Sequence, residues 1–439
     1  MEMKNISLFL YLMSMLCLVY CEKFRFDNYT LYKMYPKTEI QISLLQKLQE
    51  NDLNLDFWTD PVPNAKYVMV LSSPKNKESL ENIMNKNAMA FEVAQSNIQE
   101  SIDKELVASS TRMVDGRWNT YYKLDAIYGW LDTLATRYSG VVTVIYGGTS
   151  YEGRQIKGVK ISHGPNKRAV VIEGGIHSRE WISPATVNYI TNELLSSKDE
   201  EIRAVARDFD WYIFPVTNPD GYVWSHEEFR MWRKNRRPTI GNSIGVDLNR
   251  NWNNNWLAQG SSTNPASDSY AGPGPFSEPE TRSLSTFISS IGNKIDLYLS
   301  FHSFGQLLLI PFGNTTEPIA NYHDALHIGE KAMETLSVRF GTQYVTGNIA
   351  EAIYLATGGS IDWVKEREQV PLVYCYELRD RGTHGFVLPP EQILPTGQET
   401  MDSILELIHE ARELGYLNSG STVGASVLMM ILLLITNLL

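Results

Sequence analysis

Cysteine is scarce in this sequence: only 3 occur among 439 residues. Cys17 and Cys21 lie in or beside an apolar segment at the start of the chain, and Cys375 stands alone near the other end. Three cysteines in these positions exclude a disulfide framework. If a processing cut follows Cys21, the remaining protein keeps a single thiol.

Long runs of basic residues are also missing. No run of Lys and Arg exceeds a few residues, and the formal net charge is −11 at pH 7. We therefore expect no nucleic-acid partner. Hydrophobic residues make up 43% of the chain and charged residues 20%, an ordinary globular composition. It excludes disorder, collagen and a long coiled coil for the bulk of the protein.

The longest apolar runs lie at the two ends of the chain. Residues 6–20 follow Lys4 and are almost entirely apolar, which predicts a secretory signal peptide at residues 1–21. An N-terminal membrane anchor is the alternative, but this run is shorter than the ~20 residues that a span needs. The glycosylation triplets at Asn28 and Asn314 agree with secretion.

The second apolar run covers residues 423–439 and follows the small residues Ser419, Gly420 and Ser421. Small residues, a short spacer and a terminal apolar tail predict a lipid-anchor signal at 418–439. A membrane helix is the alternative, although no Lys or Arg flanks it. We expect an extracellular protein that is secreted and tethered to the membrane at the cell surface.

Between the ends, the residue pattern changes once. Residues 22–112 mix strand and helix periodicities, which predicts a small α+β unit followed by a polar linker. Arg112 and Arg117 in this polar stretch are candidate cleavage sites for a trypsin-like protease. Residues 113–417 alternate apolar strands with helices, so the expected fold class is α/β, with a sheet covered on both faces.

Two strand ends carry residues that can bind a metal. His177 and Glu180 follow an apolar strand at residues 169–173, and His302 ends a second strand. The carboxyl ends of strands in α/β sheets are where ligands bind. Two His and one Glu leave a fourth coordination position open for water, which is the pattern of catalytic zinc.

A hydrolase also needs a general base and groups that stabilise charge. Glu377 ends an apolar strand, which is unusual for an acid without a partner or a chemical role. The basic group 233–237 and the segment 247–250 offer hydrogen-bond donors. By composition alone, both are typical of a solvated face.

Together these stretches resemble the zinc carboxypeptidases of the pancreatic carboxypeptidase A/B type, over about residues 121–414. The resemblance implies a mixed central β-sheet with helices on both faces, preceded by a small α+β activation domain. The shared motifs, in family order, are SYEGR at 150–154, GIHSREWISP at 175–184, NPDGY at 218–222, MWRKNR at 231–236, GVDLNRNW at 245–252, SEPE at 277–280, HS at 302–303, GGSIDW at 358–363 and ELRD at 377–380.

The resemblance assigns chemical roles. His177, Glu180 and His302 match the ligands of one zinc ion, in agreement with the choice made from residue chemistry. Glu377 matches the catalytic carboxylate, which takes a proton from water and returns it to the leaving amine. Arg236 matches the arginine that stabilises the oxyanion together with zinc. The implied reaction is hydrolysis of the last peptide bond of a peptide or protein.

The resemblance also implies a site for the free carboxylate of the substrate. Asn249, Arg250 and Tyr354 match the carboxylate clamp of the family, and Arg179 matches a secondary docking site. Arginine suits this role because its planar fork grips a carboxylate with two parallel bonds. Asp247 matches a residue that accepts the second ring N–H of His177 and so orients it.

Specificity depends on the pocket for the last side chain. The position that is Asp in the basic-specific branch of the family is Ile361 here, and Ile349, Leu309 and Gly313 match other uncharged pocket positions. An apolar pocket rejects Lys and Arg, so we expect aromatic or aliphatic C-terminal residues to be released. Cys375 also faces this pocket, either as a small buried hydrophobe or as a thiol that makes the pocket sensitive to oxidation.

Residues 22–112 resemble the activation segment of the family, which covers the active site until a trypsin-like protease cuts, here at Arg112 or Arg117. We expect a monomer that is made as a zymogen and acts on peptide or protein C-termini. A binding protein on an inactive peptidase fold is the alternative, but the sequence lacks none of the residues that catalysis requires.

Overall fold

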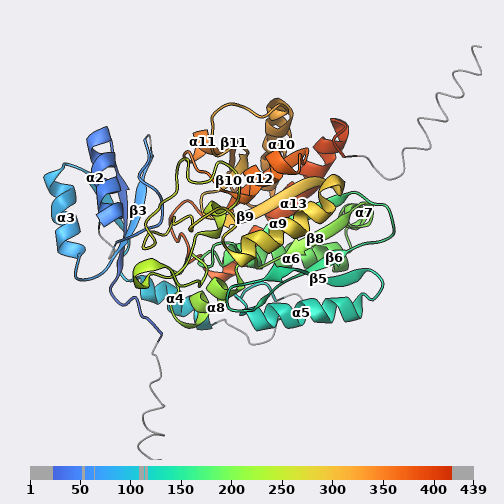
Figure 1. Cartoon of the computed structure of the whole chain (residues 1–439), viewed down its shortest axis with the longest axis horizontal. Coiled ribbons are helices and arrows are strands. Elements are labelled where there is room, and N and C mark those ends of the chain that lie inside the picture. Colours follow the sequence, from blue (N-terminus) through green and yellow to red (C-terminus); the bar gives the residue numbers. More distant parts are fainter. Residues whose placement is uncertain (1–22, 52–54, 64, 108–112, 114–116, 418–439) are drawn as a thin grey trace, which may run out of the picture.

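The computed structural model describes residues 23–51, 55–63, 65–107, 113 and 117–417 (Figure 1). The predicted signal peptide, the predicted anchor signal and Arg112 lie outside these residues, whereas Arg117 is described and exposed. Among the described residues, no helix is both long enough and apolar enough to cross a membrane.

The first unit, blue in Figure 1, is a small α+β fold on a four-stranded antiparallel sheet with the order β2-β3-β1-β4. Side chains alternate between the faces of a sheet. Tyr32 and Val70 therefore pack against α2 and α3, whereas Leu31 and Met69 share a cluster with residues of the larger unit. The elements are β1 (Thr30–Tyr35), α2 (Glu39–Asn51), β2 (Leu55–Phe57), β3 (Val68–Ser72), α3 (Lys77–Lys86), β4 (Ala90–Gln95) and α4 (Ile98–Val107).

The larger unit is built on an eight-stranded mixed sheet with the order β11-β10-β12-β9-β7-β8-β6-β5. Its central strands β12, β9, β7 and β8 are parallel. Towards the edges, β10 and β6 run antiparallel to these strands. The strands are β5 (Val142–Thr149), β6 (Gln155–Ile161), β7 (Ala169–Gly174), β8 (Asp210–Phe214), β9 (Ile295–Ser303), β10 (Leu307–Ile310), β11 (Val345–Asn348) and β12 (Leu372–Leu378).

Helices cover both faces of this sheet, as the sequence predicts. One face packs against α5, α6, α7, α10 and α13, and the opposite face packs against α9 and α12. The helices are α5 (Leu124–Arg137), α6 (Ile182–Ser196), α7 (Glu200–Asp208), α8 (Pro219–Glu227), α9 (Pro279–Ile291), α10 (Tyr322–Phe340), α11 (Ile349–Ala352), α12 (Ser360–Arg367) and α13 (Ile393–Glu413), with short 3₁₀ helices at Ile240–Asn242, Leu248–Arg250, Gly292–Lys294 and Pro390–Gln392.

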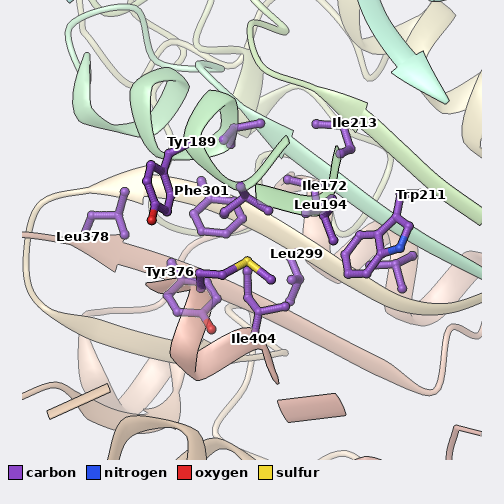
Figure 2. Close-up of a cluster of buried hydrophobic side chains, with 14 of the residues drawn as sticks. Ile172, Tyr189, Leu194, Trp211, Ile213, Leu299, Phe301, Tyr376, Leu378 and Ile404 are labelled. Carbon is purple, nitrogen blue, oxygen red and sulfur yellow. The ribbon is translucent and has the colours of Figure 1, made fainter. Parts of the chain in front are cut away.

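The core on the α6 and α13 face is shown in Figure 2. Ile172 of β7, Leu299 and Phe301 of β9, and Tyr376 of β12 are each 0% exposed. The rings of Phe301 and Tyr376 stack with their centroids 4.9 Å apart. This apolar packing holds the central strands in a single arrangement.

Side chains alternate along a strand, so the residues that lie between these core residues point to the opposite face of the sheet. On the paired parallel strands β9 and β12, His302 lies directly opposite Glu377. The strand β7 is also parallel to β9, and His177 follows its end. Parallel strands end at the same edge of a sheet, so these three residues from distant segments meet there.

Truncating Leu299 to Ala should destabilise the protein by about 2–5 kcal/mol, because it leaves a cavity between strands that cannot close around it. The measurement is the shift of the thermal or urea unfolding transition. Val338 of α10 is 83% exposed, so Val338→Ala serves as the control. The control should change stability by less than about 0.5 kcal/mol. Equal effects of the two substitutions would contradict this description of the core.

Candidate active site

The ligand atoms of His177, Glu180 and His302 all lie within 4.8 Å of one another. The Nδ1 atom of His177 is 2.8 Å from Glu180 Oε1, and the Nδ1 atom of His302 is 3.1 Å from Glu180 Oε2. The two Nδ1 atoms are 3.1 Å apart, and all three residues are buried. Two imidazoles and a carboxylate that face one point form a donor set that fits zinc.

Asp247 supports this cluster, as the sequence predicts. Its Oδ1 atom lies 3.1 Å from His177 Nε2, the ring nitrogen that faces away from the other two ligands. Its Oδ2 atom accepts hydrogen bonds from Arg233 Nη2 at 2.9 Å and Nε at 3.1 Å. Burial alone would raise the pKa of Asp247, but the charge of Arg233 and the contact with His177 hold it well below its usual value. Asp247 is therefore a permanent anion behind His177.

Glu377 lies beside the cluster because β12 pairs with β9 in parallel register. Part of its surface stays open, yet the surrounding protein raises the pKa of its carboxyl group to about 8 by desolvation, against the opposing charge of His302. A carboxylate with a raised pKa next to a metal site is suited to general acid and base chemistry.

Of the two arginines in the MWRKNR segment, the structure brings Arg233, and not the predicted Arg236, to the metal-binding cluster. The guanidinium of Arg236 lies 3.6 Å from the ring centroid of Trp224, and its nearest ion-pair partner is Glu152 at 3.9 Å. Arg233 instead reaches the metal cluster, with Nη1 3.7 Å from Glu180 Oε1. The segment between these two arginines is not helical. In extended chain, residues three apart point in opposite directions, so only one of the two can face the site.

The three residues predicted to form a carboxylate clamp lie together beside the metal-binding cluster. Arg250 Nη2 donates to the hydroxyl of Tyr354 at 2.7 Å, and Arg250 itself is buried. The side-chain amide of Asn249 lies 3.3 Å from His302 Nε2. A guanidinium and an amide from the 3₁₀ helix Leu248–Arg250 and a phenol from Tyr354 therefore lie at one side of the cluster, and such groups can bind a carboxylate.

The predicted pocket residues also come together. Leu309, Ile361 and Cys375 belong to one buried cluster, and Ile349 packs against it. At Gly313, a Cβ atom would lie 3.2 Å from the side chain of Ile349, so the glycine preserves space in this wall. Burial raises the pKa of the Cys375 thiol well above its usual value. The thiol is therefore neutral, which supports its interpretation as a small hydrophobe.

The first unit covers this site and contacts the substrate-binding candidates. Asp56 of β2 accepts a hydrogen bond from Arg179 Nη1 at 3.0 Å. Burial, opposed by Arg250 and assisted by the neighbouring Asp60, raises the pKa of the Tyr354 hydroxyl. Two carboxylates of the first unit thus lie at groups that the sequence assigns to substrate carboxylates.

A buried ion pair fastens the end of the first unit to the larger one. Glu105 of α4 accepts hydrogen bonds from Arg230 Nε at 2.8 Å and Nη2 at 3.0 Å, and both side chains are at most 1% exposed. Arg230 Nη1 also donates to the backbone carbonyl of Arg179 at 2.8 Å. Sequence reasoning missed Asp56, Glu105, Arg230 and the role of Arg233. The acids stand in no local motif, and their partners are remote in sequence.

Comparison with known proteins agrees with this geometry. The sequence model "Zinc carboxypeptidase" matches residues 127–403, and the model "Carboxypeptidase activation peptide" matches residues 32–105. The chain is 41% identical over 396 residues to Zinc carboxypeptidase A 1 of Anopheles gambiae, covering 89% of this chain and 92% of that protein. It is 49% identical over 301 residues to a zinc carboxypeptidase of Simulium vittatum, covering 68% and 99%.

The fold also matches a solved structure. The crystal structure of carboxypeptidase A from Helicoverpa armigera is 30% identical in sequence and superposes with a TM-score of 0.79, over 89% of this chain and 99% of that one. Each unit of the structure thus matches a family model, and the zinc-binding donor set lies in the larger unit. The chain belongs to the zinc carboxypeptidase family, and it carries the activation peptide of that family in front of its catalytic unit.

Proposed function

We propose that the activated enzyme releases aromatic or aliphatic residues from the C-termini of peptides, with Glu377 and Arg233 as its catalytic residues. The observation that carries this proposal is the common location of three features. The buried His177–Glu180–His302 cluster, a carboxylate clamp and an uncharged pocket lie side by side at one sheet edge.

In this mechanism the clamp binds the terminal carboxylate of the substrate and so sets the position of the scissile bond. Arg250, with Asn249 and Tyr354, takes the terminal carboxylate of the substrate, and the last side chain enters the pocket at Ile361. His177, Glu180 and His302 would hold a zinc ion, which would supply Lewis acidity and lower the pKa of a bound water. Glu377 accepts the proton of the attacking water and delivers it to the leaving amine.

Arg233 adds a fixed positive charge where negative charge develops. Asp247 holds its guanidinium through two hydrogen bonds, so the side chain needs no reorganisation during the reaction. A preorganised donor at a developing oxyanion is worth about 3–4 kcal/mol. Arg236 cannot supply this charge from its place against Trp224.

Replacing Arg233 with Ala should lower kcat about 10²- to 10³-fold, because one preorganised oxyanion donor is lost. Arg236→Ala is the matched control, since it removes the same side chain from the same segment. It should keep kcat/KM within about fivefold of the wild type. The measurement is steady-state hydrolysis of a peptide ending in Phe, with zinc content determined for each variant. A larger loss in the Arg236 variant would restore the original assignment.

The uncharged pocket is the basis of the specificity proposal. Ile361, Leu309 and Cys375 are buried and Ile349 partly so, and none of these side chains can pair with a charge. Placing Lys, Arg or Glu there without a partner costs several kcal/mol. Apolar side chains instead gain about 25 cal/mol per Å² of surface buried.

The activated enzyme should therefore hydrolyse peptides ending in Phe or Leu with kcat/KM at least about 100-fold above those ending in Arg or Glu. The assay uses four peptides that differ only in the last residue. The Arg and Glu peptides control for charge of either sign. A preference for Arg or Glu would show that a charged partner for the last side chain exists in the pocket.

We also propose that the first unit keeps the enzyme inactive until the linker is cut at Arg112 or Arg117. Asp56 accepts a hydrogen bond from Arg179, and Asp60 lies beside Tyr354. The Glu105–Arg230 ion pair holds α4 in place. Substrate carboxylates would have to displace these acids from the groups that bind them.

Limited trypsin treatment should raise peptidase activity by at least about tenfold, and a zinc chelator should abolish it. Asp56→Ala should raise the activity of the uncut protein, because it removes the carboxylate of the first unit from Arg179 and leaves only Asp268 of the larger unit, 3.2 Å from Arg179 Nη1. The control is Asp27→Ala, which removes an acid of the same unit whose partner is the exposed Arg25. An uncut Asp56 variant as inactive as the wild type would remove this contact from the inhibitory set. An inactive protein after cutting and zinc loading would refute the enzymatic proposal itself.

The apolar segments at residues 6–20 and 423–439 support a proposal about location. We propose that it is secreted and held at the cell surface by a lipid attached near residues 418–420. Expression in cultured cells should give surface activity that a phosphatidylinositol-specific phospholipase releases into the medium. Activity that stays with the cells after this treatment would favour a membrane helix instead.

A further inference from the structure

Glu173 is a buried carboxylate in the middle of the main sheet. It lies near the end of β7, shortly before the ligand His177, and is 1% exposed. A carboxylate in such a position loses its hydration, which is costly unless hydrogen bonds replace it. None of the steps proposed above uses this residue.

Hydroxyl groups from three separate segments satisfy Glu173. Its Oε1 atom accepts hydrogen bonds from Ser360 Oγ at 2.7 Å and from Ser300 Oγ at 3.0 Å. Its Oε2 atom lies 3.5 Å from Thr217 Oγ1, whose shorter hydrogen bond, at 3.1 Å, goes to the backbone carbonyl of Gly174. Within the part of the chain that the structure describes, no ion pair to a basic side chain accompanies these bonds. Contacts of this one carboxylate, which belongs to β7, therefore link β9, the segment after β8 and the start of α12.

The Ser360 bond leads directly to the substrate-binding residues. Ser360 is the first residue of α12 and immediately precedes Ile361 of the pocket. Its backbone N–H donates to Asn249 Oδ1 at 2.9 Å. Asn249 in turn lies 3.3 Å from His302 through its amide nitrogen. One serine thus connects Glu173 to the pocket on one side and to the clamp on the other.

The Ser300 bond ties the same carboxylate to the metal cluster. Ser300 and His302 lie on the same face of β9, and Ser300 is paired with Cys375 on β12. In the register of the sheet, Glu173 is itself the partner of Ser300. The oxygen that holds Ser300 is the one that holds Ser360. The start of α12 is therefore fixed relative to the strand that carries a zinc ligand.

We propose that Glu173 is a positioning residue that sets the place of the first turn of α12, and with it the pocket at Ile361 and the amide of Asn249. This inference rests on the proposed roles of those two residues. It assigns to Glu173 an effect on substrate binding and side-chain preference, and no contact with the substrate.

The choice of substitution separates hydrogen bonding from charge. Glu173→Gln retains a carbonyl oxygen that accepts from both serines, and its amide group can donate to Thr217. We expect KM for a peptide ending in Phe to stay within about threefold of the wild type. Glu173→Leu removes all acceptors, and KM should rise about tenfold or more while zinc content is unchanged.

A matched pair of single-hydroxyl variants makes the test independent of how Glu173→Leu folds. Ser360→Ala and Thr217→Val each remove one hydroxyl group beside the same carboxylate, at 2.7 Å for Ser360 and 3.5 Å for Thr217, whose hydroxyl also donates to the backbone carbonyl of Gly174. Only Ser360 adjoins the pocket and the clamp. In the activated, zinc-loaded enzyme, Ser360→Ala should raise KM about fivefold with a smaller change in kcat, and should alter the ratio of Phe to Leu hydrolysis. Thr217→Val should leave both within about twofold.

Thermal unfolding of the same samples tests whether a loss of stability explains the difference. The inference is overturned if Ser360→Ala matches the wild type in KM and in the Phe to Leu ratio, or if Thr217→Val changes both as much. It is also overturned if Glu173→Gln behaves like Glu173→Leu in a folded, zinc-containing form. A wild-type enzyme without activity on any C-terminus would instead refute the proposed function.

Discussion

Parallel pairing of β7, β9 and β12 is the constraint on which the site depends. These strands come from distant parts of the sequence, and apolar packing on both faces holds them in one register. Parallel strands end at the same edge of a sheet. The pairing of these strands therefore brings His177, His302 and Glu377 together at that edge. The stacked core drawn in Figure 2 thus acts on catalysis indirectly, by fixing the strands that carry the ligands.

Charge in this buried region is arranged in compensating pairs. Arg233 faces both Asp247 and Glu180, and Asp247 in turn faces the outer nitrogen of His177. A buried charge without a partner would cost several kcal/mol, so these residues can be buried only together. The arrangement also distinguishes the two arginines of the MWRKNR motif by their partners. Arg233 contacts two carboxylates of the site, whereas the guanidinium of Arg236 packs against two tryptophan rings.

The docking of the activation peptide depends on the same need to pair buried charges. A site that grips carboxylates must expose cations in a partly dry cleft, and such cations are stabilised by any acid that reaches them. Asp56 reaches Arg179, and Glu105 reaches Arg230, whose other contacts include the backbone of Arg179. The β-sheet of the first unit supports these contacts by burying its second face against the larger unit. The contacts that dock the first unit thus include Arg179, for which we propose a role in binding substrate carboxylates.

The sequence by itself determined the elements and the local chemistry. Strand and helix periodicity predicted a covered α/β sheet behind a small α+β unit, and the His-x-x-Glu turn with a remote His at a strand end predicted the zinc ligands. These signals are local, since each ligand lies beside its own strand. Tertiary structure decided what depends on contacts between remote segments. It placed Arg233 rather than Arg236 beside the His177–Glu180–His302 cluster, Asp56 on Arg179, and Glu173 beside the first residue of α12. Periodicity cannot show which way a side chain points in an irregular segment, or which distant partner it meets.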